Sequence, residues 1–363
     1  MFKITPSGTL TTLHEFCPTG IGCSDGAGPT GLLQATDGNF YGTTSDGGKA
    51  CLPLKINHCG VVFKITPTGT YSVLYTFCQA RPLQCLDGGE PFAGLSQSTD
   101  GYLYGTTTVG GLGSGGTVFS LSQNGTLAVL HSFALEEGYF PEGILVQGTD
   151  GGFYGTTRFG GSSSAGSVFS ITTQGVFESS SFDVTNGVDA FAGLIQATDG
   201  NFYGTTSLGG DGIKCGNSEG CGTIFRFTPP DQITTIYSFC LRANCPDGRS
   251  PNSALVQGTD GNLYGTTSEG GSNNLGTAFV LKLDLPPFVK TLPSGGSVGT
   301  LVRILGTNLT EADSVTFNGT PASFTVISHS EITTSVPTGA TTGRVQVTTP
   351  SGTLLSNLPF VVK

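Results

Sequence analysis

The stretch TDGNFYGTT, residues Thr36–Thr44, decides the fold, because the same motif recurs four more times along the chain. The recurrences are TDGYLYGTT from Thr99, TDGGFYGTT from Thr149, TDGNFYGTT from Thr198 and TDGNLYGTT from Thr259. The motif aspartates are 63, 50, 49 and 61 residues apart, and a Gly-Gly pair follows each copy. Self-similarity at this period indicates a repeat architecture over most of the chain.

Each repeat contains four short runs of alternating apolar and polar residues. The motif is one run, GVVFKITP from Gly60 and TYSVLYTF from Thr70 follow it, and GLLQATDG from Gly31 leads into it. Phe63 and Ile65 are expected to face one side and Lys64 and Thr66 the other, which is the period of a strand. The Asp-Gly pair predicts a two-residue hairpin turn. Four antiparallel strands per repeat predict β-propeller blades, and the hairpins disfavour the alternative, a parallel β-helix.

The strands at the two ends of the array leave two interpretations open. The chain begins at FKITPSG, Phe2–Gly8, which matches the third strand of a repeat, and the array ends at Val280–Leu283 without a fourth strand. One interpretation is a five-bladed ring in which Thr9–Phe16 completes the last blade. The other is the shortened end of a longer array, which a start in mid-repeat without a signal peptide favours.

The composition agrees with an all-β protein. The 363 residues include 58 Gly, 19 Pro and 24 Phe, and only 11% are charged. Long helices need more Ala, Leu, Glu and Lys than this. The 36% of hydrophobic residues is enough for a core and excludes general disorder. No apolar run is long enough to cross a membrane as a helix.

The C-terminal part differs from the repeats in charge and pattern. Residues 1–284 carry 22 acidic and 11 basic side chains, a net charge of −11, whereas residues 285–363 carry 3 acidic and 4 basic ones. The pair Pro286-Pro287 marks the linker. Short strand-like runs separated by turns follow it, which predicts an immunoglobulin-like β-sandwich. We therefore expect a propeller domain at 1–284 and a sandwich domain at 285–363.

Ten cysteines fall into five close pairs. The two long intervals between motif aspartates contain four cysteines each, and the two short intervals contain none. The lengthened loops thus gained cysteines in pairs, which predicts local disulfides and an oxidising compartment outside the cytosol. Zinc is the alternative, disfavoured because the spacings are not CxxC and histidines are scarce nearby. The predicted disulfides are Cys17-Cys23, Cys51-Cys59, Cys78-Cys85, Cys215-Cys221 and Cys240-Cys245.

Two sets of acidic residues are candidates for a binding site. The motif aspartates fit either calcium ligands or turn residues, and Asp-Gly favours the turn. A second set precedes the first strand of each repeat and, if the blades are related by rotation, forms an acidic ring on one face. The ring consists of Asp25, Asp87, Glu137, Asp189 and Asp247, and in the fourth repeat Asn186 is a candidate beside Asp189 for this position. It is the candidate site for a ligand or a cation, with a solvated turn as the alternative, and calcium is the only cofactor it suggests.

No catalytic motif stands out. The sequence contains no HExxH motif and no GxSxG elbow between a strand and a helix, and the histidines do not cluster. His14 and His131 occupy the repeat position of Tyr75 and Tyr237, which indicates blade residues. The tyrosines of the YGTT segments fit packing between blades better than stacking on sugars. A net charge of −10 without a basic run excludes nucleic acid as a partner.

These residues resemble two known families. The YGTT and VFKITP segments over 1–284 resemble the GloVer tandem repeat of bacterial secreted or surface-anchored proteins of the choice-of-anchor type. GTLVRILGTNL from Gly299, VTFNGTPA from Val315 and the closing FVV from Phe360 resemble an IPT/TIG domain. The first resemblance implies an exported protein and assigns no catalytic residues. The second implies a spacer or adhesive module.

These observations predict an extracellular or cell-surface protein. We expect it to bind a polysaccharide or a surface protein through propeller loops, without enzymatic activity. The alternative is a carbohydrate-active hydrolase or lyase that uses loop carboxylates on one propeller face. Catalysis usually breaks internal symmetry, and no ring carboxylate stands out from its repeat equivalents, which favours binding.

Overall fold

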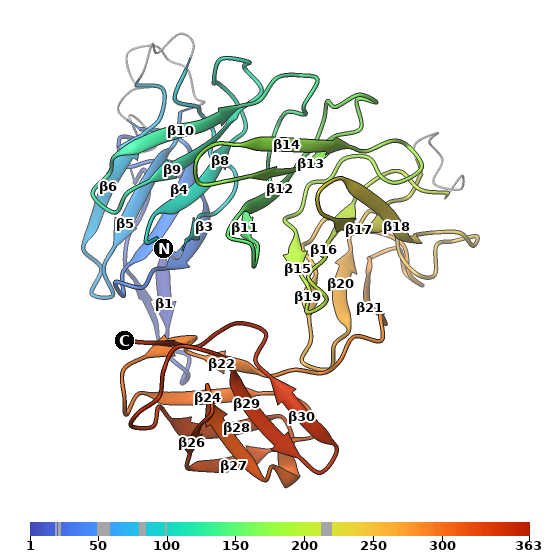
Figure 1. The fold of residues 1–363 in the computed structure, drawn as a ribbon. Coiled ribbons are helices and arrows are strands. Elements are labelled where there is room, and N and C mark those ends of the chain that lie inside the picture. The colour runs from blue at the N-terminus through green and yellow to red at the C-terminus, as the bar shows by residue number, and fades with distance from the viewer. Residues whose placement is uncertain (19, 21–22, 49–58, 80–84, 99, 212–219) are drawn as a thin grey trace. The chain divides into compact units, whose positions relative to one another are not determined.

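The computed structural model describes residues 1–363 except 19, 21–22, 49–58, 80–84, 99 and 212–219 (Figure 1). Its regular structure is β-strand, and among the described residues η2 (Leu309–Glu311) is a short 3-10 turn. The chain divides into two compact units. The first comprises Met1–Gln196, Gly200–Leu255 and Thr266–Ala278, and the second Ala197–Asp199, Val256–Gly265 and Phe279–Lys363. The all-β fold is confirmed, while the domain boundary after residue 284 stays a prediction.

The repeats form four-stranded antiparallel sheets, as predicted. The strands of the first two are β3 (Ala27–Gln34), β4 (Phe40–Asp46), β5 (Val61–Ile65), β6 (Tyr71–Thr76), β7 (Ser96–Gln97), β8 (Leu103–Thr107), β9 (Thr117–Leu121) and β10 (Leu127–Ser132). The strands of the next two are β11 (Val146–Gln147), β12 (Phe153–Thr157), β13 (Ser167–Ile171), β14 (Phe177–Ser181), β15 (Ile195–Gln196), β16 (Phe202–Thr206), β17 (Thr223–Thr228) and β18 (Gln232–Ser238). Within each set of four, every strand pairs with the next one in sequence.

The ends of the array pair differently from the five-bladed interpretation. Their strands are β1 (Phe2–Ile4), β2 (Leu10–Thr12), β19 (Val256–Gln257), β20 (Leu263–Thr267) and β21 (Thr277–Leu281). β1 and β2 form a two-stranded sheet of their own, and β19, β20 and β21 form a sheet of three. Among the described residues, Thr9–Phe16 therefore does not complete the last sheet. β1 and β2 thus pair only with each other, and the centroid of the Phe16 ring that follows them lies 5.1 Å from that of Phe63.

The Asp-Gly turn is one residue longer than predicted. The Gly38 amide donates to the Ala35 carbonyl, and the Ala35 amide donates to the Asn39 carbonyl, both at 2.9 Å. The loop Thr36–Gly38 thus has three residues. Gly38 has φ +83°, which the left-handed position after a type I turn requires.

The YGTT segment is explained by packing, as the copy at residues 154–157 shows. Gly155 lies against Phe169, so that a Cβ at this position would come within 2.5 Å of the ring. Thr156 Oγ1 donates to the Ala192 carbonyl at 3.1 Å. Ala192 precedes the first strand of the next sheet in the sequence. Thr157 Oγ1 accepts the backbone amide at the start of β13 at 2.9 Å. Thr43 and Thr205 make the equivalent contact to the Ala93 and Ser253 carbonyls, and Thr106 donates to the Pro141 carbonyl two residues earlier. In these four copies the motif therefore joins a sheet to the segment that leads into the next one.

The second unit contains the predicted immunoglobulin-like sandwich. Its strands are β22 (Lys290–Leu292), β23 (Gly295–Gly296), β24 (Leu301–Leu305), β25 (Ser314–Phe317), β26 (Thr320–Ala322), β27 (Phe324–Ser328), β28 (Glu331–Ser335), β29 (Val345–Thr349), β30 (Gly352–Leu355) and β31 (Val361–Val362). Two four-stranded sheets, β22-β24-β28-β27 and β26-β25-β29-β30, make its layers. Alternate residues such as Val302, Ile304, Val315 and Phe317 form the buried core.

Candidate functional site

The motif aspartates hold the turns in which they lie. Asp37 Oδ1 accepts the Asn39 amide at 3.0 Å. Its Oδ2 accepts the Tyr41 hydroxyl at 2.8 Å and Lys64 Nζ at 3.3 Å. Partial burial raises the pKa of Asp37, but these hydrogen bonds outweigh it and bring the pKa to about 2. The same tyrosine–aspartate bond joins Tyr104 to Asp100, Tyr154 to Asp150 and Tyr264 to Asp260. The structure thus supports the turn interpretation of these residues.

The YGTT tyrosines of the inner repeats are packing residues. The Tyr104 ring stacks on Phe153 with centroids 4.1 Å apart, and the Tyr154 ring stacks on Phe202 at 3.9 Å. Both tyrosines are buried. The predicted packing role is confirmed for them, because the stacked rings belong to neighbouring sheets.

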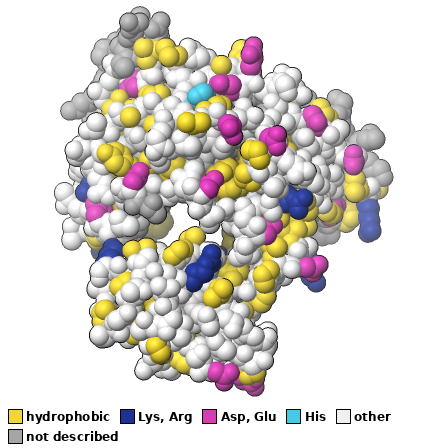
Figure 2. All heavy atoms as spheres, viewed as in Figure 1, with side chains coloured by type: hydrophobic (Ala, Val, Ile, Leu, Met, Phe, Trp, Pro, Cys, Tyr) yellow, Lys and Arg dark blue, Asp and Glu magenta, His cyan; other side chains and the backbone are white. Residues whose placement is uncertain are grey.

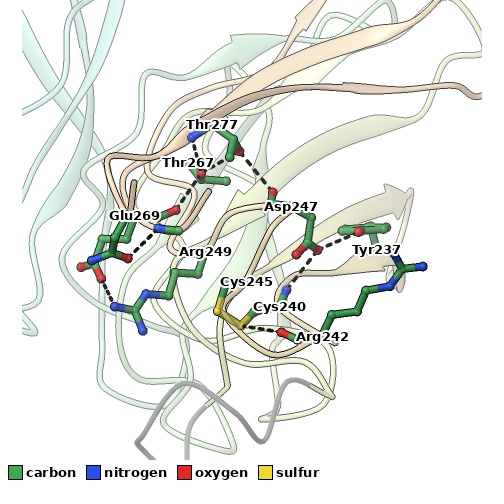
Figure 3. Close-up of a disulfide and its surroundings, with 11 residues drawn as sticks. Tyr237, Cys240, Arg242, Cys245, Asp247, Arg249, Thr267, Glu269 and Thr277 are labelled. Carbon is green, nitrogen blue, oxygen red and sulfur yellow. Dashed lines mark hydrogen bonds and ion pairs between the residues drawn. A yellow bond between two sulfur atoms is a disulfide. The ribbon is translucent and has the colours of Figure 1, made fainter. Parts of the chain in front are cut away.

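Four residues of the predicted acidic ring cap the loop that follows a fourth strand. Asp247 Oδ2 accepts the Tyr237 hydroxyl at 2.7 Å and the Cys240 amide at 3.1 Å (Figure 3). Glu137 Oε2 lies 3.0 Å from both His131 Nε2 and the Ala134 amide. Equivalent bonds join Asp87 to Tyr75 and Gln79, and Asp25 to His14 and Cys17. Each carboxylate therefore ties a ring on the strand to a backbone amide of the loop.

Asp189 does not share this geometry, and Asn186 does. The Asn186 side-chain oxygen accepts the Asp183 amide at 2.8 Å, which is the backbone contact that the capping carboxylates make. Asp189 lies three residues further on, at a position of left-handed backbone with φ +63°. Its equivalents are Glu90, Phe140 and Ser250, with φ of 52°, 55° and 53°. Of the two candidates in this repeat, Asn186 therefore occupies the capping position and Asp189 does not.

The capping bonds give the ring a structural role. In Figure 2, the acidic side chains on the face in view are spread over the surface rather than gathered in one patch. A carboxylate that accepts two protein hydrogen bonds has less capacity left for a metal ion. The ring as a ligand or cation site, formed by Asp25, Asp87, Glu137, Asp189 and Asp247, stays a prediction.

Disulfides close the loops that the capping residues hold. Three predicted bridges are present, namely Cys17-Cys23, Cys78-Cys85 and Cys240-Cys245. Cys59 and Cys221 are also disulfide-bonded, and their predicted partners Cys51 and Cys215 lie outside the described residues. The sulfurs of Cys221, Cys240 and Cys245 lie within 4.8 Å of one another. All three are oxidised, so they do not offer thiolates to a metal ion.

A charged cluster breaks the symmetry of the repeats. It consists of Glu142, Arg158 and Asp189. Arg158 follows the YGTT segment, where the other repeats have Ser45, Thr108, Ser207 and Ser268. Glu142 occupies the position of Thr30, Phe92, Phe191 and Asn252. Arg158 and Glu142 are therefore charged where the other repeats have uncharged residues, whereas Asp189 has an acidic equivalent in Glu90.

Arg158 lies between the two carboxylates of the charged cluster. Its Nε donates to Asp189 Oδ1, and its Nη1 lies 3.6 Å from Glu142 Oε1. The rings of Phe159 and Phe191 lie 4.9 and 5.6 Å from the guanidinium carbon, within the range of cation–π attraction. The guanidinium is thus held by both charge and aromatic contacts.

Glu142 is the least satisfied member of the cluster. Its side chain is 10% exposed, and Oε2 accepts no hydrogen bond from any residue that the structure describes. Burial raises the pKa of Glu142, and Arg158 only partly offsets this effect. A buried acceptor without a donor costs about 1–3 kcal/mol. The folded chain bears this cost, because Oε2 has almost no exposed surface through which water could reach it.

Sequence reasoning did not single out Glu142 and Arg158. The signal was available, because both positions depart from their repeat equivalents when the five copies are aligned. The contact between them was not visible, because it joins a loop to the end of a strand 16 residues away in sequence.

Comparison with known proteins agrees with the two-part organisation. A family model described as Gloeobacter/Verrucomicrobia repeat matches residues 1–215 and 179–300, and an IPT/TIG domain model matches residues 287–362. No curated protein matches the sequence. Among the described residues, no helix has the length and apolarity to cross a membrane.

Similar solved structures share little sequence with this chain. A putative gluconolactonase is 11% identical, with 85% of this chain and 89% of that chain covered and a TM-score of 0.41. A gluconolactonase from Xanthomonas campestris is 11% identical, with 86% and 88% covered and a TM-score of 0.40. A protein of unknown function from Dyadobacter fermentans is 12% identical, with 85% and 93% covered and a TM-score of 0.40.

Proposed function

Because the chain belongs to the Gloeobacter/Verrucomicrobia repeat family and carries an IPT/TIG domain, we propose that it is an extracellular or cell-surface binding protein. Its ligand is a polysaccharide held by loops of the repeat array, and binding involves no chemical turnover. A surface protein is the other partner that such loops would suit.

The observation that carries the proposal is the oxidised state of the loops. The bridged cysteines are separated by 6, 7 and 5 residues, so each bridge closes one short loop. Disulfides of this kind persist in oxidising compartments. A loop that is closed by a disulfide and capped by a carboxylate loses little conformational entropy when it binds a ligand. Rigid loops on a repeated scaffold therefore favour binding.

One observation favours the alternative, a carbohydrate-active hydrolase or lyase. Burial raises the pKa of Glu142, as in a general acid. A second carboxylate, Asp189, shares its arginine partner. Two carboxyl groups in different environments are the usual equipment of glycoside hydrolysis.

A sedimentation assay with product analysis separates these functions. The oxidised full-length chain is mixed with insoluble polysaccharides in calcium or in EDTA, and supernatants are examined for unbound protein and released sugar. The proposal expects saturable retention without released sugar. Released oligosaccharides would establish the hydrolase or lyase instead, and elution by EDTA would identify the acidic ring as a calcium site. No retention on any polymer contradicts the proposal.

A further inference from the structure

We propose that strand β21, at the end of the repeat array, pairs with the segment Thr9–Phe16 of a second copy of the chain, so that copies associate head to tail. The incoming segment completes the last sheet as its fourth strand. The inference concerns self-association and goes beyond the proposed function, on which it does not rest.

The last sheet has an open edge along β21 (Figure 1). It consists of β19, β20 and β21, whereas the four sheets before it have a fourth strand next to the third, and no described residue extends it further. No residue of β21 is buried, although all five residues of its equivalent β9 are. The sequence TAFVL of β21 contains no charge. An exposed and uncharged edge of this kind is a template for pairing with another strand.

One backbone carbonyl shows where the missing strand belongs. In each of the four complete sheets, the phenylalanine after the fourth strand donates its amide to the glycine before the third strand. These bonds, of 2.9–3.1 Å, join Phe77 to Gly60, Phe133 to Gly116, Phe182 to Gly166 and Phe239 to Gly222. Gly276 is the equivalent glycine before β21, and its carbonyl accepts no backbone amide from the residues that the structure describes. The incoming strand must therefore bring an amide to this position.

The segment Thr9–Phe16 has the sequence of a fourth strand. Its residues TLTTLHEF match TLAVLHSF at Thr126–Phe133, the segment that contains β10. In the structure it pairs with β1 over only three residues, Leu10–Thr12, and all three are exposed. A sheet of two strands is marginally stable by itself. Since β21 offers five residues, it is a longer partner for the segment than β1.

The backbone of Phe16 supplies the donor that Gly276 lacks. The Phe16 amide donates to no backbone carbonyl in the part of the chain that the structure describes. When the register of β10 on β9 is transferred to Thr9–Phe16 on β21, this amide meets the Gly276 carbonyl. Replacement of β1 by β21 therefore satisfies a donor and an acceptor that are both open.

The exchange keeps the contacts that hold Thr9–Phe16 on the first sheet. The Phe16 ring lies 5.1 Å from that of Phe63, and His14 Nε2 lies 3.1 Å from Asp25 Oδ2. Only β1 leaves its place. Each copy offers β21 to one neighbour and Thr9–Phe16 to another, so two different surfaces meet. Contacts of this kind build open chains of subunits or closed oligomers.

Sedimentation velocity of the oxidised full-length chain at rising concentration tests the inference. Val280 lies four residues after Gly276, so its backbone groups point to the same open edge, and Val280→Pro removes the amide there. Val280→Lys is the matched control, because Lys64 holds this position in the first repeat and pairs with a fourth strand. Melting temperatures check that both variants fold. The peptide TLTTLHEF competes for β21 without any substitution in the protein, and TLPTLHEF is its control.

We expect wild-type protein and Val280→Lys to form oligomers as the concentration rises. Association of Val280→Pro should be about tenfold weaker or more, because backbone hydrogen bonds are lost. TLTTLHEF should shift wild type towards the monomer, and TLPTLHEF should not. A wild-type protein that stays monomeric at every concentration overturns the inference, whether β21 stays open or the same chain's Thr9–Phe16 covers it. Oligomers that persist in Val280→Pro and in the presence of TLTTLHEF overturn the assignment to β21.

Discussion

Tyr237 donates a hydrogen bond of 2.7 Å to Asp247 Oδ2, which also accepts the Cys240 amide at 3.1 Å (Figure 3). The bond ties strand β18 to the loop that leads into the next repeat. Burial and the neighbouring carboxylate raise the pKa of Tyr237 to about 12, so the phenol remains a donor at neutral pH. Equivalent pairs are His14 with Asp25, Tyr75 with Asp87 and His131 with Glu137. Acidic residues that look like a binding ring in the sequence are thus parts of a repeated loop cap.

Replacing the cap at Asp247 tests its structural role. We expect Asp247→Ala to lower the free energy of unfolding by about 1–3 kcal/mol, because the Tyr237 hydroxyl and the Cys240 amide lose their acceptor. Asp247→Asn should cost clearly less, since Asn186 caps the fourth repeat with an amide oxygen. Urea unfolding followed by circular dichroism measures both variants. Equal destabilisation by the two substitutions would argue against capping.

The glycine of the YGTT segment tests the packing of the sheets. A Cβ at Gly155 would meet Phe169 Cζ at 2.5 Å, so Gly155→Ala should destabilise the protein by about 1–3 kcal/mol. Gly152→Ala is the matched control, because its nearest neighbour would lie 3.5 Å away and other repeats have asparagine or tyrosine there. We expect Gly152→Ala to change stability by less than about 0.5 kcal/mol. Similar thermal unfolding of the two variants would contradict this packing.

The pairing of the cysteines is the next testable feature. Cys221 lies beside the Cys240-Cys245 bridge, so exchange between them is sterically feasible. We expect peptide mapping without reduction to find Cys240 joined to Cys245 and Cys221 joined to Cys215. Removal of the first bridge by C240S/C245S should cost about 2 kcal/mol, as expected for a short loop. A Cys221–Cys240 peptide would contradict the assignment.

The pKa of Glu142 predicts how stability depends on pH. Burial raises this pKa, so ionisation of Glu142 destabilises the folded chain as the pH rises through the folded-state value. We therefore expect the Glu142→Gln variant to melt at a higher temperature than wild type at pH 7. The difference between the two proteins should shrink below pH 4, where Glu142 is protonated and, like glutamine, carries no charge. Arg158 keeps Asp189 as a partner in the variant. A lower melting temperature for Glu142→Gln at pH 7 would refute the predicted direction.

The sequence predicted features that depend on local spacing. The strand order follows from runs of period two, and the three described bridges follow from cysteines that lie 5 to 7 residues apart. The turn was misjudged by one residue, because Asp-Gly occurs both in two-residue turns and in three-residue loops with a left-handed glycine. Only the hydrogen bond between Ala35 and Asn39 distinguishes the two.

Features that depend on the alignment of repeats or on distant contacts were harder to predict. The fourth repeat left Asn186 and Asp189 as two candidates for the ring because it has no acidic residue at the capping position, and only the hydrogen bond of Asn186 distinguishes them. The charged cluster joins Arg158 to Asp189 across 31 residues, which no local pattern reveals. A departure from repeat symmetry was its only sequence signal.

The central claim is that the acidic residues between the repeats cap loops rather than form a binding ring. It is tested most directly by comparing Asp247→Asn with wild type in one binding isotherm on the polymer that the wild-type protein retains. The substitution replaces the carboxylate by an amide, which keeps an oxygen acceptor for the Tyr237 hydroxyl and the Cys240 amide. We predict that Asp247→Asn leaves the half-saturation concentration within about twofold of wild type. Loss of binding by Asp247→Asn would contradict the claim and return the site to the acidic ring.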